Sequence, residues 1–458
     1  MSIETVLITE EQKNYILALE EGHFVDVKAT DIEPAKLTHH VSAFANADGG
    51  ELYIGIAEDK IANRKYWQGF TDPENANGHL QIFERLFPLG HDFSYTFLSC
   101  ATESGLVLQI IINKTKDIKI ASDNIPYIRR SAQSLPVKTP QELQRLQLNK
   151  GITSFENEAI PVSVREITNS IHIIRFMIEV IPTAEPEPWL KKQQLIREDK
   201  PTVAGIILFA EEPQAIIPKR CSIKIYRYQT TDHVGSRETL VFDPITIEGC
   251  AYDQIKAAVS KTVGIVESIS VLTASGLEKA KYPRETLHEI ITNAVLHRDY
   301  SLADDIHVRI FDNRIEVESP GRLPAHITTE NILEERFARN GAIVRLINKF
   351  PDPPNKDVGE GLNTAFEAMR QLHLKDPVIT DRENSVLVQI RHEPLASPEE
   401  IIIEYLNNNP QINNTKAREI CYIHSENAMK KHFEKLAKMG LIERVPGRGG
   451  RASAYRLK

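Results

Sequence analysis

Three polar side chains recur at every fourth position of one short segment past the middle of the chain. In EIITNAVLHRDY (residues 289–300), Glu289, Asn293 and His297 share one edge of a predicted helix, because residues four apart on a helix lie on the same face. The residues between them are mostly apolar and can pack on a sheet. Spacing alone therefore places an acid, an amide and an imidazole on one edge of the helix. A helix with a solvated polar face would show the same pattern, so the spacing by itself does not identify a binding site.

Glycines further along the chain indicate what the polar edge could bind. Gly321 follows a predicted strand over residues 314–318, and Gly359 and Gly361 precede a predicted helix. Glycines in such turns let backbone N–H groups approach phosphate oxygens closely. Together, the polar edge and the glycine turns favour a site for phosphate groups over a merely solvated face.

A second set of candidate residues lies near the N-terminus. Glu21, Asp26, Lys28 and Asp59 (or its neighbour Glu58) flank a predicted strand–helix–strand unit. Clustered carboxylates can hold Mg²⁺ or Mn²⁺ for phosphodiester cleavage, and a lysine beside them can steady the attacking water or the phosphate. Acids at strand ends are also commonly solvated, so the residues alone leave both interpretations open.

Charge is distributed unevenly, with a basic C-terminal end on an acidic chain. The net charge of the whole chain is −8. From residue 411 to residue 458 there are eleven Lys and Arg residues and four Glu residues, so this segment carries +7 (11 − 4). A local basic patch attracts phosphate whatever the global sum, and we therefore expect a nucleic-acid contact there.

Composition restricts the class of protein. A chain of 458 residues that is 41% hydrophobic and 26% charged is typical of a globular protein with several domains. It has no apolar run of about 18 residues and begins with an acidic segment, so we expect a cytoplasmic protein without a membrane partner. Its cysteines are far apart, which favours small buried side chains over a disulfide framework or a zinc finger. They are Cys100, Cys221, Cys250 and Cys421.

Secondary-structure patterns in the first half of the chain divide it into two segments. Residues 1–148 predict an α+β unit with a strand ending at Lys28, a helix through THHVSAFANA, a Gly-Gly turn and an alternating apolar strand. Residues 149–278 predict a helix at ITNSIHIIRFMIEVI and strands at 203–210 (VAGIILFA) and 221–228 (CSIKIYRY). The second segment thus connects the N-terminal unit to the rest of the chain.

The second half also divides into two segments. Residues 279–395 contain the helix at Glu289, a strand pair at DIHVRIFDNRIEVESP and a final strand at SVLVQIRH. Residues 396–458 predict a capped helix, two further helices and a terminal hairpin. The fold class expected for the whole chain is therefore α+β with several domains.

The N-terminal segment resembles a known domain family. The pattern E-x4-D-x-K over residues 21–28, followed by SAFANADGG and IGIAED, resembles the Schlafen/AlbA-type DNA-binding domain. In some relatives of this fold three acids form an RNA-cutting site, a role that the resemblance carries to Glu21, Asp26 and Asp59, with Lys28 beside them. Asp26 stands where this family usually has glutamate, and the aspartate side chain is shorter, so its carboxylate reaches less far toward a metal ion. The resemblance favours a binding platform over a nuclease.

A later part of this segment, DNIPYIRRSAQSLP, adds candidate nucleic-acid contacts. Tyr127 can stack on a base, and Arg129 and Arg130 can pair with phosphate. An edge strand with solvated charges explains the same residues, and IPYIRRSA matches the late strand of the Schlafen/AlbA family.

Residues 280–390 resemble a second family. YPRE, the TNAVLHRDYS core, SPGRLP, an Arg-Asn pair and Gly-Glu-Gly occur in the order found in the GHKL ATP-binding fold, in the divergent form of RecG-like helicases and transcriptional regulators. The resemblance implies an α/β sandwich that binds ATP with Mg²⁺, hydrolyses it slowly and uses it to close a homo-oligomer.

The GHKL resemblance assigns roles to individual residues. Asn293 would bind the Mg²⁺ that bridges the phosphates, and Glu289 would orient or deprotonate the hydrolytic water. Gly321 would shape the loop on the adenine side, and Gly359 and Gly361 would form the lid over the phosphates.

The residues after the helix carry less defined roles. By the same resemblance His297, Arg298 and Asp299 lie near the triphosphate or brace the helix. Glu318-Ser319-Pro320-Gly321 stands where the family usually has an adenine-reading aspartate, so the phosphates are the better supported part of the site.

The C-terminal segment resembles the winged helix-turn-helix family, through KLAKMGLIERVPGRGGRASAYRL. Its third helix would enter the major groove of DNA with Lys430 and Lys431, and the wing would bring Arg448 and Arg451 to the backbone or the minor groove. Winged helices also serve protein–protein contacts, but the charge of +7 favours nucleic acid.

Together these expectations describe an ATP-binding, nucleic-acid-binding regulatory protein. Its domains would be a Schlafen/AlbA-like unit (1–148), an α/β connecting segment (149–278), a divergent GHKL domain (279–395) and a winged helix (396–458). ATP with Mg²⁺ would set the arrangement of the DNA- or RNA-binding modules in a homo-oligomer. The alternative is a nucleotide-gated, metal-dependent endonuclease of a defence system against phage, acting on RNA such as tRNA or on DNA.

Overall fold

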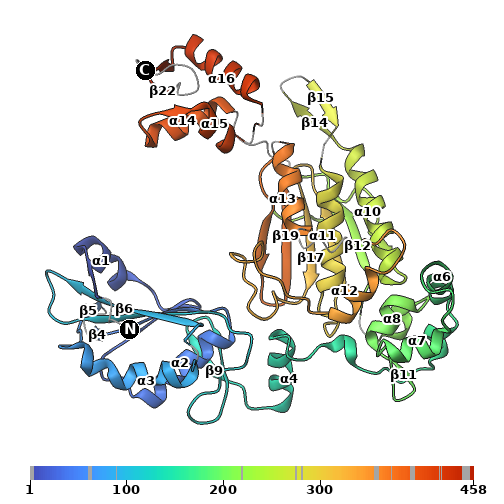
Figure 1. Cartoon of the computed structure of the whole chain (residues 1–458), viewed down its shortest axis with the longest axis horizontal. Helices are drawn as coiled ribbons and strands as arrows, with labels where there is room; N and C mark the ends of the chain where they lie inside the picture. Colours follow the sequence, from blue (N-terminus) through green and yellow to red (C-terminus); the bar gives the residue numbers. More distant parts are fainter. Residues whose placement is uncertain are drawn as a thin grey trace. The chain divides into compact units, whose positions relative to one another are not determined.

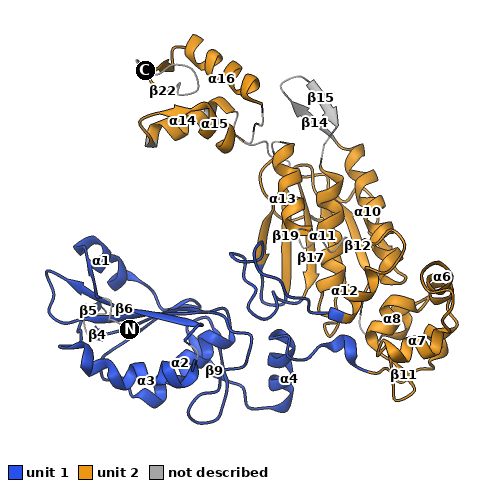
Figure 2. Cartoon of the chain, in the orientation of Figure 1, with its two compact units in different colours: residues 1–158, 321–341, 381–384 blue, residues 159–320, 342–380, 385–458 orange. Residues whose placement is uncertain are grey.

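The structure, a computed structural model, contains two compact units (Figure 2), and each is described by itself. Unit 1 comprises residues 1–158, 321–341 and 381–384, and unit 2 comprises residues 159–320, 342–380 and 385–458. The residues described by the structure are 5–59, 64–88, 90–217, 220–273, 276–279, 282–354, 361–372, 374–391, 398–421, 423, 425–445 and 454–458.

Unit 1 is built on a five-stranded mixed sheet. Its strands are β1 (Thr5–Ile8), β2 (Val25–Lys28), β3 (Gly50–Ile54), β6 (Phe93–Cys100) and β7 (Val107–Ile112). They lie in the order β1-β6-β7-β3-β2, with β1 parallel to β6, β2 parallel to β3 and the other neighbours antiparallel. The parallel pair β2–β3 requires a crossover, which the helix between these strands supplies.

Helices and hairpins surround this sheet. The helical segments are α1 (Glu10–Ala18), α2 (Pro34–Asn46), η1 (Pro73–Ala76), α3 (Asn77–Leu86), α4 (Pro140–Asn149) and η2 (Phe155–Asn157). The hairpins are β4 (Ile56–Asp59) with β5 (Arg64–Trp67), and β8 (Tyr127–Arg130) with β9 (Gln133–Pro136). Thr9 and Thr139 form capping boxes that start α1 and α4. Residues of α2 and α3 pack with the sheet in one core around Phe44 and Phe83.

The SAFANADGG motif joins α2 to β3 as the sequence predicts. Asn46 is buried, and its side chain donates to the carbonyl oxygens of Lys119 (2.7 Å) and Tyr127 (2.9 Å). Gly49 has a φ of +77°, and a Cβ there would lie 2.5 Å from the carbonyl oxygen of Ile112. The motif therefore needs a buried amide to fix a neighbouring loop and a glycine to turn into the strand.

Unit 2 is centred on a six-stranded sheet. Its strands are β12 (Ile223–Arg227), β13 (Ile245–Ile247), β16 (Ile306–Ile310), β17 (Arg314–Pro320), β18 (Val378–Asp381) and β19 (Ser385–Arg391). Their order is β13-β12-β16-β17-β19-β18, with β12 parallel to β16, and β13–β12, β16–β17 and β17–β19 antiparallel. The strands expected at CSIKIYRY, at DIHVRIFDNRIEVESP and at SVLVQIRH are all present.

Long helices pack on this sheet. Figure 1 shows α10 (Ala251–Ser268), α11 (Arg284–His297) and α13 (Gly361–Gln371) over one of its faces. The shorter α12 (Gly341–Ile347) precedes α13, η3 (Arg237–Thr239) lies between β12 and β13, and β14 (Ser270–Thr273) pairs with β15 (Gly276–Lys279). The helix expected within residues 289–300 is the C-terminal part of α11, which ends at His297.

The segment before β12 is more helical than its sequence predicts. Its elements are α5 (Arg165–Thr168), α6 (Ile171–Val180), α7 (Pro186–Lys192), β10 (Ile196–Arg197), β11 (Lys200–Pro201), α8 (Val203–Phe209) and α9 (Pro213–Ile216). The strand expected at VAGIILFA is wrong, because these residues form α8. The side chain of Thr202 caps this helix by accepting a hydrogen bond from Gly205 N, and every residue of α8 is buried. A short run that is apolar on all sides has no periodicity that separates a buried helix from a buried strand.

The C-terminal part of unit 2 combines helices with a small sheet. Helices α14 (Pro398–Asn408), α15 (Asn414–Ile420) and α16 (Glu426–Lys438) accompany the antiparallel sheet β20 (Ile412–Asn413), β22 (Ala454–Leu457) and β21 (Ile442–Arg444), in that order. Their core includes Phe433, which stacks on Tyr455 at 4.3 Å between ring centroids. The expected helices and terminal hairpin are present. Among the described residues, no helix is long and apolar enough to cross a membrane.

Candidate nucleotide and nucleic-acid sites

The polar edge of α11 is held in place by hydrogen bonds to its neighbours in unit 2. The buried Thr286 hydroxyl donates to the carbonyl oxygen of Ala365 in α13 (2.8 Å), and Ser319 at the end of β17 donates to that of Ala294 (2.8 Å). Ile290, Ile291 and Val295 are buried on the other face. Because its apolar face is packed, α11 has a fixed orientation, and Glu289 and Asn293 therefore project from it in a fixed direction.

Glu289 and Asn293 form a half-buried pair on that edge. Asn293 Nδ2 donates a hydrogen bond to Glu289 Oε1 at 2.8 Å. Burial raises the pKa of Glu289 above its usual value, although the hydrogen bond from Asn293 acts in the opposite direction. A Cβ added to Gly361, the first residue of α13, would lie only 2.1 Å from Glu289 Oε1. The carboxylate therefore faces the backbone at the start of α13, and a larger residue at position 361 would have to displace it.

The residues that follow on α11 have different surroundings. His297 is half-buried, whereas Arg298 and Asp299 are buried. Arg298 Nη2 donates to the carbonyl oxygens of Arg220 (2.9 Å) and Asp304 (2.7 Å), and Asp299 Oδ1 accepts from the backbone N–H of Ser301 (2.9 Å). Of the two roles that the sequence left open, these contacts correspond to bracing, and we leave Arg298 and Asp299 out of the proposed ligand site.

The glycine turns are only partly described. Gly361 faces Glu289 as stated above, while Gly359 lies outside the described residues. Gly321 belongs to unit 1, has a φ of +103°, and donates its N–H to the carbonyl oxygen of Asn384 at 2.8 Å. Glu318, near the position of the family's adenine-reading aspartate, pairs with Arg309 (2.6 Å) and accepts from Ser385 (2.7 Å).

The N-terminal acids of unit 1 are tied into ion pairs. Asp26 is 1% exposed, with Oδ1 bonded to Lys28 Nζ, and Oδ2 lying 2.8 Å from Arg129 Nη1 and 3.0 Å from His40 Nδ1. Burial acts to raise the pKa of Asp26, but the hydrogen bond with His40 and the charge of Lys28 hold it well below its usual range. Lys28 Nζ also lies 3.2 Å from Glu21 Oε1.

These ion pairs make it harder for Glu21, Asp26 and Asp59 to bind a divalent metal ion together. All three acids lie in the described residues, but the ligand atoms of Glu21, Asp26 and Asp59 do not come within 4.8 Å of one another. Burial and the neighbouring Asp26 raise the pKa of Glu21. A divalent ion would have to displace cationic partners from both oxygens of Asp26, so the structure favours a platform over a metal-dependent cleavage site.

The aromatic and basic residues expected to contact nucleic acid separate in the structure. Tyr127 is buried, stacks on His39 at 4.3 Å between ring centroids, and donates its hydroxyl hydrogen to Asp123 Oδ2 (2.8 Å). The side chain of Arg129 is 0% exposed in its pair with Asp26. Arg130 remains on the surface, 3.1 Å from Glu383. Tyr127 and Arg129 are therefore part of the core, and only Arg130 of this group is placed to meet a ligand.

Unit 1 contains a further charged cluster that the sequence did not reveal, centred on Asp48 of SAFANADGG. Arg322 Nη2 lies 2.9 Å from Asp48 Oδ2 and 3.0 Å from Asp381 Oδ2. Lys114 Nζ lies 3.5 Å from Asp48 Oδ1 and donates to the carbonyl oxygen of Leu323 (3.0 Å). The contact between Asp48 and Arg322 joins residues 274 positions apart in sequence. No local pattern signals such a pairing.

The C-terminal lysines lie on the outer face of α16. Lys430 and Lys431 are exposed, and Lys430 Nζ lies 2.8 Å from Glu426 Oε1 one turn earlier. Lys435 Nζ lies 2.9 Å from Glu399 Oε1 of α14. Burial acts to raise the pKa of Glu399, but hydrogen bonds from Lys435 and His432 lower it to about 2.

The wing residues Arg448 and Arg451 lie outside the described residues. On α16, Met429, Phe433 and Leu436 face the core, so the helix presents its basic side outward.

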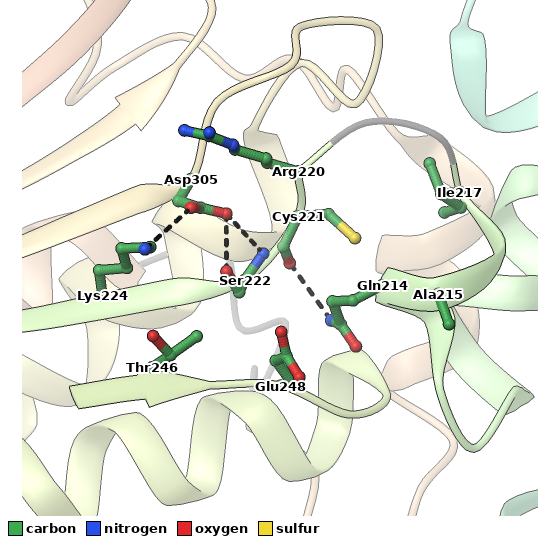
Figure 3. Close-up of a pocket in the computed structure, with 10 residues that line it drawn as sticks. All are labelled: Gln214, Ala215, Ile217, Arg220, Cys221, Ser222, Lys224, Thr246, Glu248 and Asp305. Atoms are coloured by element: carbon green, nitrogen blue, oxygen red, sulfur yellow. Dashed lines mark hydrogen bonds and ion pairs between the residues drawn. The ribbon is translucent and has the colours of Figure 1, made fainter.

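A separate cavity of about 520 Å³ lies at the edge of the unit 2 sheet (Figure 3). Ser222 donates its N–H (3.1 Å) and its hydroxyl hydrogen (2.6 Å) to Asp305 Oδ1, and Lys224 Nζ lies 4.0 Å from Asp305 Oδ2. Neither Glu289 nor Asn293 lines this cavity. Three of its polar residues, Ser222, Lys224 and Asp305, are thus paired with one another, and the cavity is separate from the α11 edge.

Comparisons with known proteins identify two segments. Residues 21–138 match the family model described as "Schlafen, AlbA_2", and residues 303–390 match the model described as "Putative ATP-dependent DNA helicase recG C-terminal". The chain thus has an N-terminal Schlafen/AlbA_2 domain and a RecG C-terminal-type domain, which confirms both resemblances drawn from the sequence. The second match begins shortly after α11. The ligand classes to which the matches point are nucleotide and nucleic acid.

Comparisons over the whole chain are less informative than the two domain matches. No curated protein matches the chain at a significant level. The solved structure of the DIP2311 protein from Corynebacterium diphtheriae is 18% identical, with a TM-score of 0.42, over 98% of this chain and 96% of that one.

Proposed function

We propose that this chain is an ATP-binding, nucleic-acid-binding regulatory protein in which the bound nucleotide controls the arrangement of its nucleic-acid-binding modules. The observation that carries the proposal is the half-buried pair of Glu289 and Asn293, fixed on α11 and facing the glycine that begins α13. An acid and an amide on a packed helix beside a glycine turn can position a metal-bound triphosphate and a water molecule.

The chemistry of the pair fits Mg²⁺ with ATP. Because Asn293 Nδ2 donates to Glu289, the oxygen Oδ1 points away from the carboxylate and is the atom that would bind Mg²⁺. The raised pKa of Glu289 makes its carboxylate a better general base than an ordinary glutamate. Bound Mg²⁺, or Mn²⁺ in its place, would supply charge neutralisation for the phosphates. His297 and Gly361 complete the proposed site.

The nucleic-acid-binding modules in this proposal are the Schlafen/AlbA_2 domain and the C-terminal segment. The order of helices and antiparallel strands in the described part of residues 398–458 supports a winged helix, in which α16 would present Lys430 and Lys431 to DNA. Arg130 is the contact that we propose on the N-terminal domain. The ion pairs of Asp26 support a platform that binds without cutting.

The proposal includes a homo-oligomer whose closure depends on nucleotide. In that arrangement ATP binding at α11 would alter the affinity for nucleic acid, because a ligand shifts a conformational equilibrium by its differential affinity for the two states.

The proposal is tested by measuring binding of labelled duplex DNA and of RNA by fluorescence anisotropy, with and without Mg-ATP, across a salt series. We expect ATP to change the affinity of the wild type, no ATP effect in Asn293→Ala, and a linear fall of log affinity with log salt concentration. Lys430→Ala/Lys431→Ala should reduce the salt slope by about 2. An affinity that is independent of salt and of ATP would contradict the proposal.

A further inference from the structure

Three side chains that could bind a metal converge in unit 2, outside the nucleotide site. His172 is in the first turn of α6, Cys250 is the N-cap residue of α10, and Asp253 is in the first turn of α10. In the described part of the chain, this is the one group of three or more His, Cys, Asp or Glu residues whose ligand atoms all lie within 4.8 Å of one another.

The distances within this group match the edges of a tetrahedral zinc site. His172 Nδ1 lies 3.5 Å from Asp253 Oδ2 and 3.6 Å from Cys250 Sγ. Zinc bonds of about 2.3 Å to sulfur and about 2.0–2.2 Å to nitrogen and oxygen, at tetrahedral angles, separate the ligand atoms by about 3.3–3.6 Å. The N···O separation of 3.5 Å is longer than an ordinary hydrogen bond. The imidazole and carboxylate are therefore spaced as two ligands of one ion.

The arrangement differs from a catalytic Cys-His-Asp triad. In a triad the nucleophile and the acid bond to opposite nitrogens of the imidazole, so that the ring can take the proton of the nucleophile while the acid orients the ring. Here both Cys250 Sγ and Asp253 Oδ2 approach the same nitrogen, Nδ1 of His172. Convergence on one point is the geometry of coordination.

Neighbouring hydrogen bonds hold the ligands from both helices. Ser170 caps α6, accepting from the N–H of Ile173 and donating to the carbonyl oxygen of Phe209. Gln214 accepts from the N–H of Gly249 (2.9 Å) and donates to its carbonyl oxygen (3.1 Å), which fixes the residue before Cys250. A site of this kind needs fixed ligand backbones, because a loose outer shell lowers metal affinity.

We propose that His172, Cys250 and Asp253 bind a Zn²⁺ ion that joins α6 to α10, with water as the fourth ligand. A thiolate, a carboxylate and a neutral imidazole balance the charge of Zn²⁺, and the thiolate selects zinc over Mg²⁺ or Ca²⁺. Cys250 is 0% exposed, whereas the side chain of Asp253 is 48% exposed, so the ion enters and keeps its water on the carboxylate side.

Binding requires loss of the thiol proton. This proton passes to solvent as zinc takes its place on the sulfur.

The test measures the metal content of the full chain, purified without chelator and without added metal, and then the spectrum of the Co²⁺-loaded protein. We expect stoichiometric zinc and a sulfur-to-cobalt charge-transfer band. Cys250→Ser should abolish that band. Asp253→Asn changes a side chain that is partly exposed and should keep the fold, yet lower zinc affinity by at least the roughly 10–100-fold that loss of an outer-shell partner costs.

The matched control is Cys221→Ser, a buried cysteine of the same unit outside the group, which should retain both zinc and the cobalt band. Failure of the wild type to bind zinc or cobalt would overturn the proposal. So would zinc binding of equal affinity in the wild type and Asp253→Asn. Neither result depends on nucleotide binding at α11.

Discussion

Removal of the Asp48 carboxylate should destabilise unit 1 strongly. The Asp48 side chain is 10% exposed and lies 2.9 Å from Arg322, 3.5 Å from Lys114 and 2.6 Å from His23. Two unit charges about 4 Å apart attract by about 4 kcal/mol at an effective dielectric constant of about 20. Asp48→Ala leaves buried cations without their partner, and we expect a loss of about 3–5 kcal/mol in the free energy of unfolding. Arg322→Ala should cost less, about 1.5–3 kcal/mol, because Asp48 keeps its other partners.

A double-mutant cycle isolates the interaction. The double variant Asp48→Ala/Arg322→Ala should be more stable than the sum of the single effects predicts, by a coupling energy of about 1–3 kcal/mol. The chain has two tryptophans, of which Trp67 is in unit 1 and Trp189 in unit 2. Urea unfolding followed by fluorescence in a Trp189→Phe background therefore reports on unit 1 alone.

The control cycle uses an exposed ion pair of the same unit. Glu33 and Lys36 lie 3.2 Å apart on α2 with both side chains 66% exposed, and their coupling should be about 0.5 kcal/mol or less. A coupling energy for Asp48 and Arg322 no larger than that of the control pair would refute the reasoning that this cluster holds unit 1 together.

Three further predictions concern other sites. The pKa of Glu399 is depressed, so its stabilising effect is present above its unfolded value of about 4.5 and lost as pH falls toward about 2. The protection factors of amides in α14 and α16, which correct for the intrinsic pH dependence of exchange, should therefore fall between about pH 4.5 and about pH 2, and Glu399→Gln should remove this pH dependence. Gly361→Ala places a Cβ against Glu289 and should lower Mg-ATP affinity at least tenfold in calorimetry, whereas Gly264→Ala, with open space around its Cβ, should not. Incubation of RNA and DNA with Mn²⁺ should give no cleavage above an Asp26→Ala control, and products that disappear in this variant would establish the nuclease instead.

Much of the N-terminal domain could be predicted from local sequence. The helix through SAFANADGG, the turn at Gly49 and the strand after it follow from apolar periodicity and from the positive φ that glycine permits. The interior partners of its polar residues could not be predicted, because Asp26 meets Arg129 across 103 positions of chain. Arg129 and Tyr127 therefore looked like ligand contacts when they are core residues.

The helix of the proposed nucleotide site was similarly predictable in part. The i, i+4 spacing of Glu289 and Asn293 predicted their shared edge, and the structure adds the hydrogen bond between them and the approach of Gly361. The zinc group could not be foreseen, since His172 and Cys250 are 78 residues apart and neither belongs to a recognisable metal motif. Residue spacing along the sequence does not predict which distant helices come together in the folded protein.

Calorimetric titration with ATP in the presence of Mg²⁺ tests the central claim most directly, using the wild type, Asn293→Ala and Glu289→Gln. We expect the wild type to bind Mg-ATP and Asn293→Ala to lose Mg-dependent binding. We expect Glu289→Gln to bind Mg-ATP but no longer to hydrolyse it. Absence of nucleotide binding by the wild type, or equal Mg-dependent binding by the wild type and Asn293→Ala, would contradict it.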